Sequence, residues 1–280
     1  MDIFSHIESL RAFLKKNKSL YKSVGFVPTM GALHNGHLAL IKQSRKENDI
    51  TVCSIFVNPA QFNNADDLAK YPRTLEQDMA MLQSASCDVL FCPSGEEMYP
   101  DKSIIKFDFG NLEQVLEGEF RPGHFSGVAL VVSKLLNIVL PNMAYFGQKD
   151  FQQYKIVECL VKELKFDVQL RCVPIQRESD GLAMSSRNAR LNERQRKDAV
   201  VFYEGLQLAK RKIKEGVPMA RIKKEVKGFC EAKEGVRLDY LEMADSTNFV
   251  LLENVTANAI LLIAGFVGEV RLIDNIFISE

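Results

Sequence analysis

The first 175 residues of this chain alternate short apolar runs with amphipathic segments, and this alternation is what most constrains the fold. Apolar runs of this length, bounded by turn residues, predict strands buried on both faces. The predicted strands span residues 24–27, 50–57, 88–92, 143–146 and 168–173. Helices are predicted from His37 onwards and over residues 74–85, 125–140 and 151–164, with Thr74 as N-cap and Gln77 completing a capping box. Strands that alternate with helices predict an α/β fold, with a parallel sheet wrapped by helices.

The pattern changes after about residue 175. Residues 177–190 are polar and punctuated by glycine, and helices and strands no longer alternate beyond them. Helices are predicted there over residues 193–214 and 218–232, and strands over residues 238–243, 259–266 and 269–276. We therefore predict two domains, residues 1–175 and 176–280, the second with a small antiparallel sheet. Residues 1–13 predict the start of an amphipathic helix, without the apolar stretch of a signal peptide.

The charge balance limits the partners of the protein. Lys plus Arg and Asp plus Glu number 36 each among the 280 residues, so no net field favours nucleic acid or an anionic membrane. No apolar run approaches the roughly 18 residues that a bilayer span needs. The six cysteines are scattered, and most lie within apolar runs, which favours buried free thiols in a reducing compartment. We therefore expect a cytoplasmic protein without nucleic-acid or membrane partners.

Residues 24–37, VGFVPTMGALHNGH, combine a strand, a glycine turn and the start of a helix. Two of the four histidines in the chain, His34 and His37, lie in this segment. A helix N-terminus offers unpaired N–H groups and partial positive charge to a phosphate, and Gly36 allows close approach of the backbone. Two imidazoles beside that site can donate hydrogen bonds to charge that builds on phosphorus, which favours nucleotidyl transfer. The alternative is a pair of surface or helix-capping histidines.

Polar residues also follow the second and fourth predicted strands. In FVNPAQF, Asn58 and Gln61 are either turn residues or, for Gln61, an orienting group for a small polar ligand in an apolar pocket. GQKDFQQ opens a helix, where Lys149 can lie against phosphate, Asp150 can accept hydrogen bonds from ribose, and Gln153 lies about one turn further on. Taken alone, that second stretch is more often a solvated helix start.

Two further stretches carry glycine and polar side chains. RPGHF, residues 121–125, leads into the apolar helix, so His124 is either a cap of that helix or a functional group, and Val131 and Val132 are core residues by default. DGLAMSSRN, residues 180–188, can wrap phosphate oxygens with hydroxyls, N–H groups and a guanidinium, or it can be a flexible interdomain linker. Ligands bind beyond the carboxyl ends of parallel strands, so three of these stretches are expected to meet at one edge of the sheet.

Six motifs together resemble those of the pantoate–β-alanine ligase family of HxGH nucleotidyltransferases: PTMGALHNGH, FVNPAQF, YPRTLEQD, RPGHFSGV, KLLNIVLPNMAYFGQKDFQQ and RESDGLAMSSRN. The resemblance covers nearly the whole chain. It implies a Rossmann-like N-terminal domain, a smaller α+β C-terminal lid domain and a homodimer. It also implies that ATP and Mg²⁺ convert pantoate into a pantoyl adenylate, which β-alanine then attacks to give pantothenate and AMP. The sequence shows no protein ligand for Mg²⁺, and we expect the phosphates to hold that ion.

The resemblance also implies the roles of individual residues. Those implied to act in catalysis are His34, His37, Lys149 and Arg187, with His37 as proton donor. Those implied to bind ATP are Met30, Gly31, Ala32, Leu33, His34, Asn35, Gly36, His37, Gly147, Gln148, Lys149, Asp150, Gln176, Met184, Ser185, Ser186 and Arg187. Those implied to bind pantoate are Pro28, Met30, Gln61, Val131, Val132 and Gln153, and Gln61 is also implied to face β-alanine.

The chain departs from the family pattern at a few positions. Gln176 stands where the family usually has a small aliphatic residue beside adenine, and Leu130 and Asn142 replace a usual threonine and aspartate. No covalent enzyme intermediate is needed, so no nucleophilic cysteine or serine is predicted. Two other interpretations stay open: another HxGH adenylyl- or cytidylyltransferase that forms no amide, and a nucleotide-binding regulator without catalysis.

Overall fold

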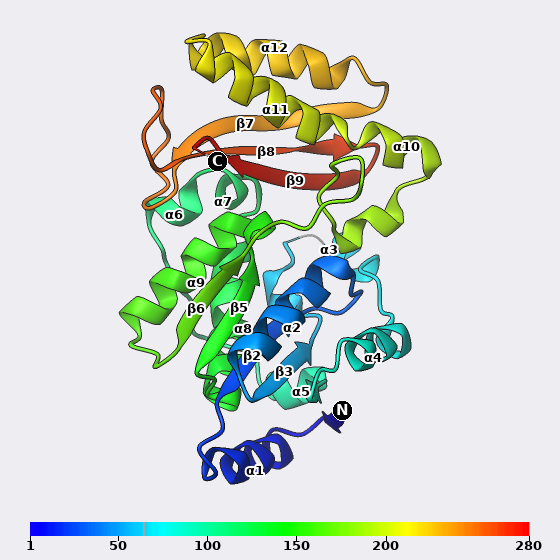
Figure 1. Cartoon of the computed structure of the whole chain (residues 1–280), viewed down its shortest axis with the longest axis vertical. Coiled ribbons are helices and arrows are strands. Elements are labelled where there is room, and N and C mark those ends of the chain that lie inside the picture. The colour runs from blue at the N-terminus through cyan, green and yellow to red at the C-terminus, as the bar shows by residue number, and fades with distance from the viewer. Residues whose placement is uncertain (64, 280) are drawn as a thin grey trace.

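The computed structural model describes residues 1–63 and 65–279 and contains a six-stranded parallel sheet (Figure 1). Its strands are β1 (Asp2–Phe4), β2 (Val24–Thr29), β3 (Ile50–Ile55), β4 (Val89–Phe91), β5 (Met143–Gly147) and β6 (Gln169–Val173). The strand order is β1-β4-β3-β2-β5-β6, so β2 lies between β3 and β5. The α/β fold and the five strands predicted from the alternation are confirmed. The chain changes direction across the sheet at β2, and sheets of this kind bind ligands at such a point.

Helices cover both faces of this sheet. They are α1 (Ile7–Lys18), α2 (Asn35–Glu47), α4 (Leu75–Ser84), α8 (His124–Val139) and α9 (Phe151–Glu163). Along β2, Val24 and Phe26 pack with residues of α1, α8 and α9, whereas Val27 packs with residues of α2 and α4. Successive strand side chains point to opposite faces, which accounts for this division. Twelve of the sixteen residues of α8 are buried, which explains why its sequence is apolar on almost every side.

Short elements complete the connections around this sheet. They are η1 (Pro59–Gln61), α3 (Ala65–Ala69), α5 (Gly95–Met98), α6 (Asn111–Gln114), α7 (Glu117–Phe120) and η2 (Gln148–Asp150). Two of them begin directly beyond central strands: η1 follows β3, and η2 follows β5.

Two local predictions for the N-terminal half are wrong. Residues 2–4 form the edge strand β1, paired with Val89–Phe91 of β4, and the helix begins only at Ile7. A three-residue edge strand is too short to show the two-residue periodicity that distinguishes strands from helices. Thr74 is the N-cap of α4 as predicted, but the capping box with Gln77 is absent, because the Thr74 hydroxyl bonds Asp78 Oδ1 at 3.2 Å instead.

A second, three-stranded antiparallel sheet follows in the chain. It comprises β7 (Val236–Asp245), β8 (Ala259–Val267) and β9 (Val270–Phe277), in the order β7-β8-β9. The preceding helices are η3 (Ser186–Arg190), α10 (Glu193–Asp198), α11 (Val201–Lys214) and α12 (Met219–Glu231). The prediction of one helix over residues 193–214 is wrong. The chain turns at residues 199–200, where the polar α10, which buries no residue, gives way to the apolar start of α11.

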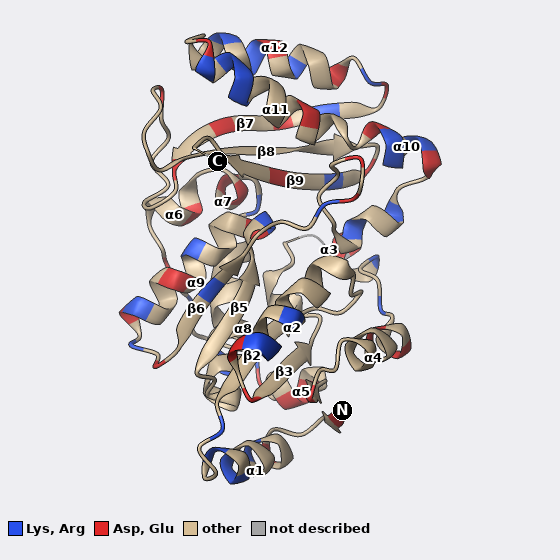
Figure 2. Cartoon of the chain, viewed as in Figure 1, with Lys and Arg blue, Asp and Glu red and all other residues tan. Residues whose placement is uncertain are grey.

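The two sheets lie one above the other (Figure 1). Helices α11 and α12 cover the outer face of the three-stranded sheet, and its strand β9 contacts η2 at the end of β5. A cluster of buried side chains that includes Phe151, Tyr240 and Leu262 joins the two parts. Acidic and basic residues are interspersed over both parts (Figure 2), in line with the 36 Lys and Arg and 36 Asp and Glu residues of the chain.

The cysteine prediction holds only in part. All six thiols are free, but only Cys53, Cys87 and Cys230 are buried, and Cys172 is exposed. Within the described residues, no helix combines the length and the apolar character that crossing a bilayer requires.

Candidate active site

A cavity of about 210 Å³ lies at the carboxyl ends of β3, β2 and β5 and is bordered by residues of the 174–187 segment. Four of the stretches singled out in the sequence contribute to its lining: the histidine turn, the Gln61 turn, the Lys149 turn and the Ser185–Arg187 loop. The histidine pair, Lys149, Gln61 and Gln153 therefore share one cavity, as expected from the ends of three adjacent strands.

The two histidines form the first turn of α2 and cap it. Gly36 N–H donates to His34 Nδ1 at 3.1 Å, and His34 N–H donates to His37 Nδ1 at 3.3 Å. A side chain at Gly36 would come within 2.7 Å of the His34 ring, so only glycine lets that ring fold back over the turn. Each Nδ1 accepts an N–H, which assigns the ring proton to Nε2. The capping alternative is thus correct, and yet both rings also line the cavity.

Both imidazoles are neutral in the absence of a ligand. Burial, with smaller effects from His37 and Lys149, lowers the pKa of His34 to about 3. Burial and Lys149 lower the pKa of His37 to about 4. The ring centroids are 4.1 Å apart. At neutral pH each ring therefore offers an N–H donor, and the charge of an arriving phosphate would favour its protonation.

Asp78 fixes the turn that precedes the two histidines. Its buried carboxylate accepts the Ala32 N–H at 2.9 Å and the Leu33 N–H at 2.7 Å. The side chain of Leu33 points into the core beside α2 and α4. The family resemblance assigned Ala32 and Leu33 to ATP, but their main-chain N–H groups are engaged within the fold.

Gln61 is fixed in a mostly apolar wall of the cavity. The side chain is 7% exposed, its Oε1 accepts from Asn58 Nδ2 at 3.1 Å, and its Nε2 lies 3.0 Å from Met30 Sδ. Asn58 also donates to the Gly127 carbonyl at 3.1 Å, which ties η1 to α8. A side chain at Gly127 would come within 2.1 Å of the Ala60 carbonyl, so glycine is what allows this close approach. Asn58 is thus a scaffold residue, as its turn interpretation predicted, and Gln61 faces the cavity.

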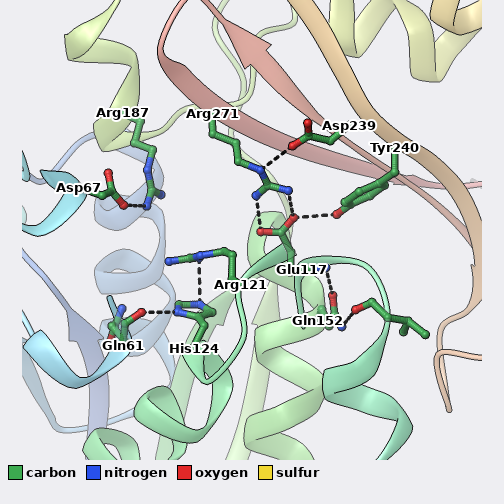
Figure 3. Close-up of polar contacts among 11 residues, drawn as sticks. Gln61, Asp67, Glu117, Arg121, His124, Gln152, Arg187, Asp239, Tyr240 and Arg271 are labelled. Atoms are coloured by element: carbon green, nitrogen blue, oxygen red, sulfur yellow. Dashed lines mark hydrogen bonds and ion pairs between the residues drawn. The ribbon is translucent and has the colours of Figure 1, made fainter. Parts of the chain in front are cut away.

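The Ser185–Arg187 loop borders the cavity from the C-terminal side. Ser186 Oγ donates to the Ala32 carbonyl at 2.9 Å, which joins this loop to the histidine turn. Arg187 Nη2 lies 3.1 Å from Asp67 Oδ2, and Arg190 Nη1 lies 2.9 Å from Asp67 Oδ1 (Figure 3 shows the first pair). Burial alone would raise the pKa of Asp67, but the two guanidiniums hold it below its usual value. Asp67 is therefore a charged counter-ion to Arg187 in this state.

Comparison with known proteins decides the family. The sequence profile described as pantoate-beta-alanine ligase matches residues 2–277. The chain belongs to the pantoate–β-alanine ligase family. It is 48% identical to the pantothenate synthetase of Aquifex aeolicus over 98% of this chain and 97% of that protein. A pantothenate synthetase structure from Thermus thermophilus aligns over the whole of both chains, with a TM-score of 0.93 and 42% identity. A pantoate–β-alanine ligase structure from Francisella tularensis aligns over all of this chain and 98% of that chain, with a TM-score of 0.84 and 37% identity.

Most residues that the family resemblance assigned to ligands line the cavity. The assigned residues that line the cavity are Pro28, Met30, His34, Gly36, His37, Gln61, Val131, Val132, Gly147, Lys149, Asp150, Gln153, Gln176, Met184, Ser185, Ser186 and Arg187. Five others do not: Gly31, Ala32, Leu33, Asn35 and Gln148. Of these, Gln148 bonds Asn275 at 3.2 Å.

Sequence reasoning missed several lining residues. Tyr71, Phe56 and Leu135 are among them, together with Pro174 and Ile175, which precede Gln176. Tyr71 lies in the YPRTLEQD motif, and its buried hydroxyl, whose pKa is raised by burial, is hydrogen-bonded to Ser186. A tyrosine directly before proline is an ordinary turn pattern, so no local signal distinguished it.

Proposed function

We propose that this cavity carries out both half-reactions of a pantoate–β-alanine ligase: adenylation of pantoate by ATP, then amide formation with β-alanine. One observation carries the proposal: two neutral imidazoles, Lys149 and Arg187 line the same cavity as the two glutamines and an apolar wall. The family membership of the chain makes it an ATP-dependent carbon–nitrogen ligase. The Francisella tularensis relative was crystallised with β-γ ATP and β-alanine, which supports the same substrates here.

In the first half-reaction, a carboxylate oxygen of pantoate attacks the α-phosphorus of ATP. A carboxyl O–P bond forms, the bond from the α-phosphorus to the bridging oxygen breaks, and pyrophosphate leaves with the electron pair. His34 and His37 donate from Nε2 to the phosphates, and Lys149 and Arg187 supply cationic charge, so charge in the transition state is stabilised. Arg187 must leave its ion pair with Asp67 in order to contact a phosphate. The position of the loop that carries Arg187 therefore depends on whether ATP is bound.

Pantoate is held between the glutamines and the apolar wall. Gln61 and Gln153 bind its polar end, and Pro28, Met30, Val131 and Val132 pack against its two methyl groups. Gly147 and Asp150 contact the ribose, and the backbone at Gln176 lies beside adenine.

In the second half-reaction, the amine of β-alanine attacks the acyl carbon of the adenylate. The C–N bond forms, the acyl C–O bond breaks, AMP leaves with the electron pair, and the nitrogen gives up one proton to water. No side-chain nucleophile takes part in this step.

Mg²⁺ would accompany ATP on its phosphates. Among residues 1–63 and 65–279, no group of three or more His, Cys, Asp and Glu residues is placed to hold a metal ion. When bound, Mg²⁺ neutralises part of the phosphate charge.

Three broader assignments also rest on the family resemblance. We assign residues 1–175 to an ATP- and pantoate-binding domain and residues 176–280 to a lid. We further propose that the protein forms a homodimer, which sedimentation velocity tests. We also propose that it is cytoplasmic, which its six free thiols favour.

One assay separates this function from its alternatives. Purified protein receives ATP, Mg²⁺ and pantoate, and pyrophosphate is followed with and without β-alanine. We expect pantoate-dependent pyrophosphate release without β-alanine, and AMP and pantothenate only when β-alanine is added. Pyrophosphate without any amide product would identify a different HxGH transferase, and nucleotide binding without turnover would identify a regulator.

A further inference from the structure

Arg121 is a largely buried guanidinium without an acidic partner. Within residues 1–63 and 65–279, its side chain makes one hydrogen bond, from Nη1 to His124 Nε2 at 3.0 Å, and no ion pair. Burial and the neighbouring Arg187 guanidinium lower its pKa to about 10, so it remains charged at neutral pH. A buried cation without a counter-ion is costly, and it creates a strong local preference for an anion.

The nearby carboxylates are already engaged with other cations. Glu117 receives both Nη groups of Arg271 at 2.7 and 2.8 Å and the Tyr240 hydroxyl at 2.9 Å (Figure 3). Asp67 pairs with Arg187 and Arg190. Glu117 and Asp67 attract the Arg121 charge at a distance, but among the described residues neither forms an ion pair with it.

His124 couples Arg121 to the pantoate-binding turn. Its Nδ1 lies 2.7 Å from the Gln61 carbonyl, so Nδ1 carries the proton and Nε2 accepts from Arg121. Burial and Arg121 lower the pKa of His124 to about 3, which matches this neutral tautomer. His124 is the first residue of α8, after Gly123 as N-cap, so the capping interpretation of His124 is wrong. In Figure 3, the Arg121 guanidinium lies between Arg187 and the Gln61–His124 pair.

A small chamber adjoins the main cavity at this place. Arg121 and His124 line it together with Lys149, Asp150 and Gln153, which also line the main cavity. Its volume is about 20 Å³, room for one small polar group. Two of its three lining carboxylates, Glu117 and Asp274, form ion pairs with Arg271 and Arg177, and the third, Asp150, also lines the main cavity.

We propose that Arg121 binds the carboxylate of the amino-acid acceptor and thereby selects β-alanine over amines that lack a carboxylate. This proposal rests on the proposed function. The acceptor must place its amine at the acyl carbon beside Gln61, and its carboxylate lies only two methylene groups away. Lys149 and Arg187 are committed to the phosphates, so Arg121 is the cation beside Gln61 that remains for this second anion.

The test compares two acceptors and two half-reactions. The wild type, Arg121→Gln and Arg121→Lys are assayed for pantoate-dependent pyrophosphate release without β-alanine, and for amide formation with β-alanine and with its neutral amide, β-alaninamide. Arg221→Gln serves as the matched control, because Arg221 is exposed on α12 and pairs with Glu225 one helical turn further on.

We expect Arg121→Gln to lower kcat/KM for β-alanine by about 10- to 100-fold, mainly through KM, and to leave pyrophosphate release and β-alaninamide use nearly unchanged. Arg121→Lys should restore part of the preference for β-alanine, and Arg221→Gln should match the wild type. An unchanged KM for β-alanine overturns the proposal. An equal loss of pyrophosphate release also overturns it, because Arg121 would then serve the phosphates. Absence of pyrophosphate release in the wild type would instead contradict the proposed function itself.

Discussion

The side-chain amide of Asn275 on β9 donates to the main-chain carbonyls of Gln148, at 2.9 Å, and Lys149, at 3.0 Å. Asn275 itself is 1% exposed, and the two contacts are partly buried. Its neighbour Asp274 forms an ion pair with Arg177 at 2.7 Å, and Arg177 in turn bonds the Gly181 carbonyl at 3.0 Å. Two adjacent residues of the C-terminal sheet therefore anchor both the Lys149 turn and the start of the segment that leads to Arg187.

Replacing Asn275 should impair the phosphate contacts without touching a substrate. In Asn275→Ala, two partly buried carbonyls lose their donor, which should lower the free energy of unfolding by about 1–3 kcal/mol. Misplacement of Lys149 should slow pantoate-dependent pyrophosphate release by about 10- to 100-fold. Stopped-flow release assays and urea unfolding measure the two effects, with Asn258→Ala, at an exposed turn, as the control. A stability loss with wild-type release would show that Asn275 has no role in placing Lys149.

Loss of the His37 imidazole should slow the adenylation of pantoate strongly. His37→Ala should reduce adenylate formation by about 10²–10⁴-fold, because one donor to the phosphates and a proton source are removed. His6→Ala is the matched control, since His6 is exposed and pairs with Glu97. Near-normal pyrophosphate release by His37→Ala would refute the assigned role.

Gln61 should act on pantoate rather than on ATP. Gln61→Ala leaves a polar ligand without its buried partner, which should weaken pantoate binding by about 10- to 100-fold while ATP binding stays within about twofold. Isothermal titration with each ligand measures this, and Gln77→Ala, on the exposed side of α4, provides the control. Equal pantoate affinity in wild type and Gln61→Ala would contradict the assignment.

The three histidines with lowered pKa values should make the stability of the fold sensitive to acid. His34, His37 and His124 have pKa values of about 3, 4 and 3 in the folded chain, below the ordinary 6.5. The unfolded chain therefore binds more protons between pH 6.5 and 4, so the free energy of unfolding should fall as pH drops through this window. Each histidine should contribute about 1.5 kcal/mol between pH 6.5 and 5. Urea unfolding at several pH values checks this, and His34→Gln should show a shallower slope than the wild type.

The sequence predicted those parts of the fold and site that local patterns encode. The strands at β2, β3 and β5 and the histidine turn between β2 and α2 show periodicity and turn residues within a few positions. The contacts that fix the site instead join residues that are far apart in the sequence. Asn275 lies 127 residues from Gln148, and His124, which connects Arg121 to Gln61, lies 63 residues from Gln61. Nothing near Asn275 in the sequence marks an amide that holds a distant turn, so such a residue appears only in three dimensions.

The role of Asp78 could not be predicted from the sequence for the same reason: its contacts are distant in the chain. Its sequence context suggests only a helix, and the Ala32 and Leu33 N–H groups that it accepts lie more than 40 residues earlier. The family resemblance assigned residues 30–37 to ATP, and the residues themselves predicted a phosphate site at the N-terminus of the following helix. Asp78 accepts the Ala32 and Leu33 N–H groups, so we propose that the phosphate contacts come from the histidine rings and the N-terminus of α2.

The most direct test of the central claim follows the carboxylate oxygen of pantoate. The wild-type protein is incubated with ATP, Mg²⁺, β-alanine and pantoate that carries ¹⁸O in its carboxylate, and the AMP product is analysed by mass spectrometry. An adenylate intermediate transfers one labelled oxygen to AMP, and this is the result we predict. Unlabelled AMP, or label found in pyrophosphate, would contradict attack of the carboxylate on the α-phosphorus.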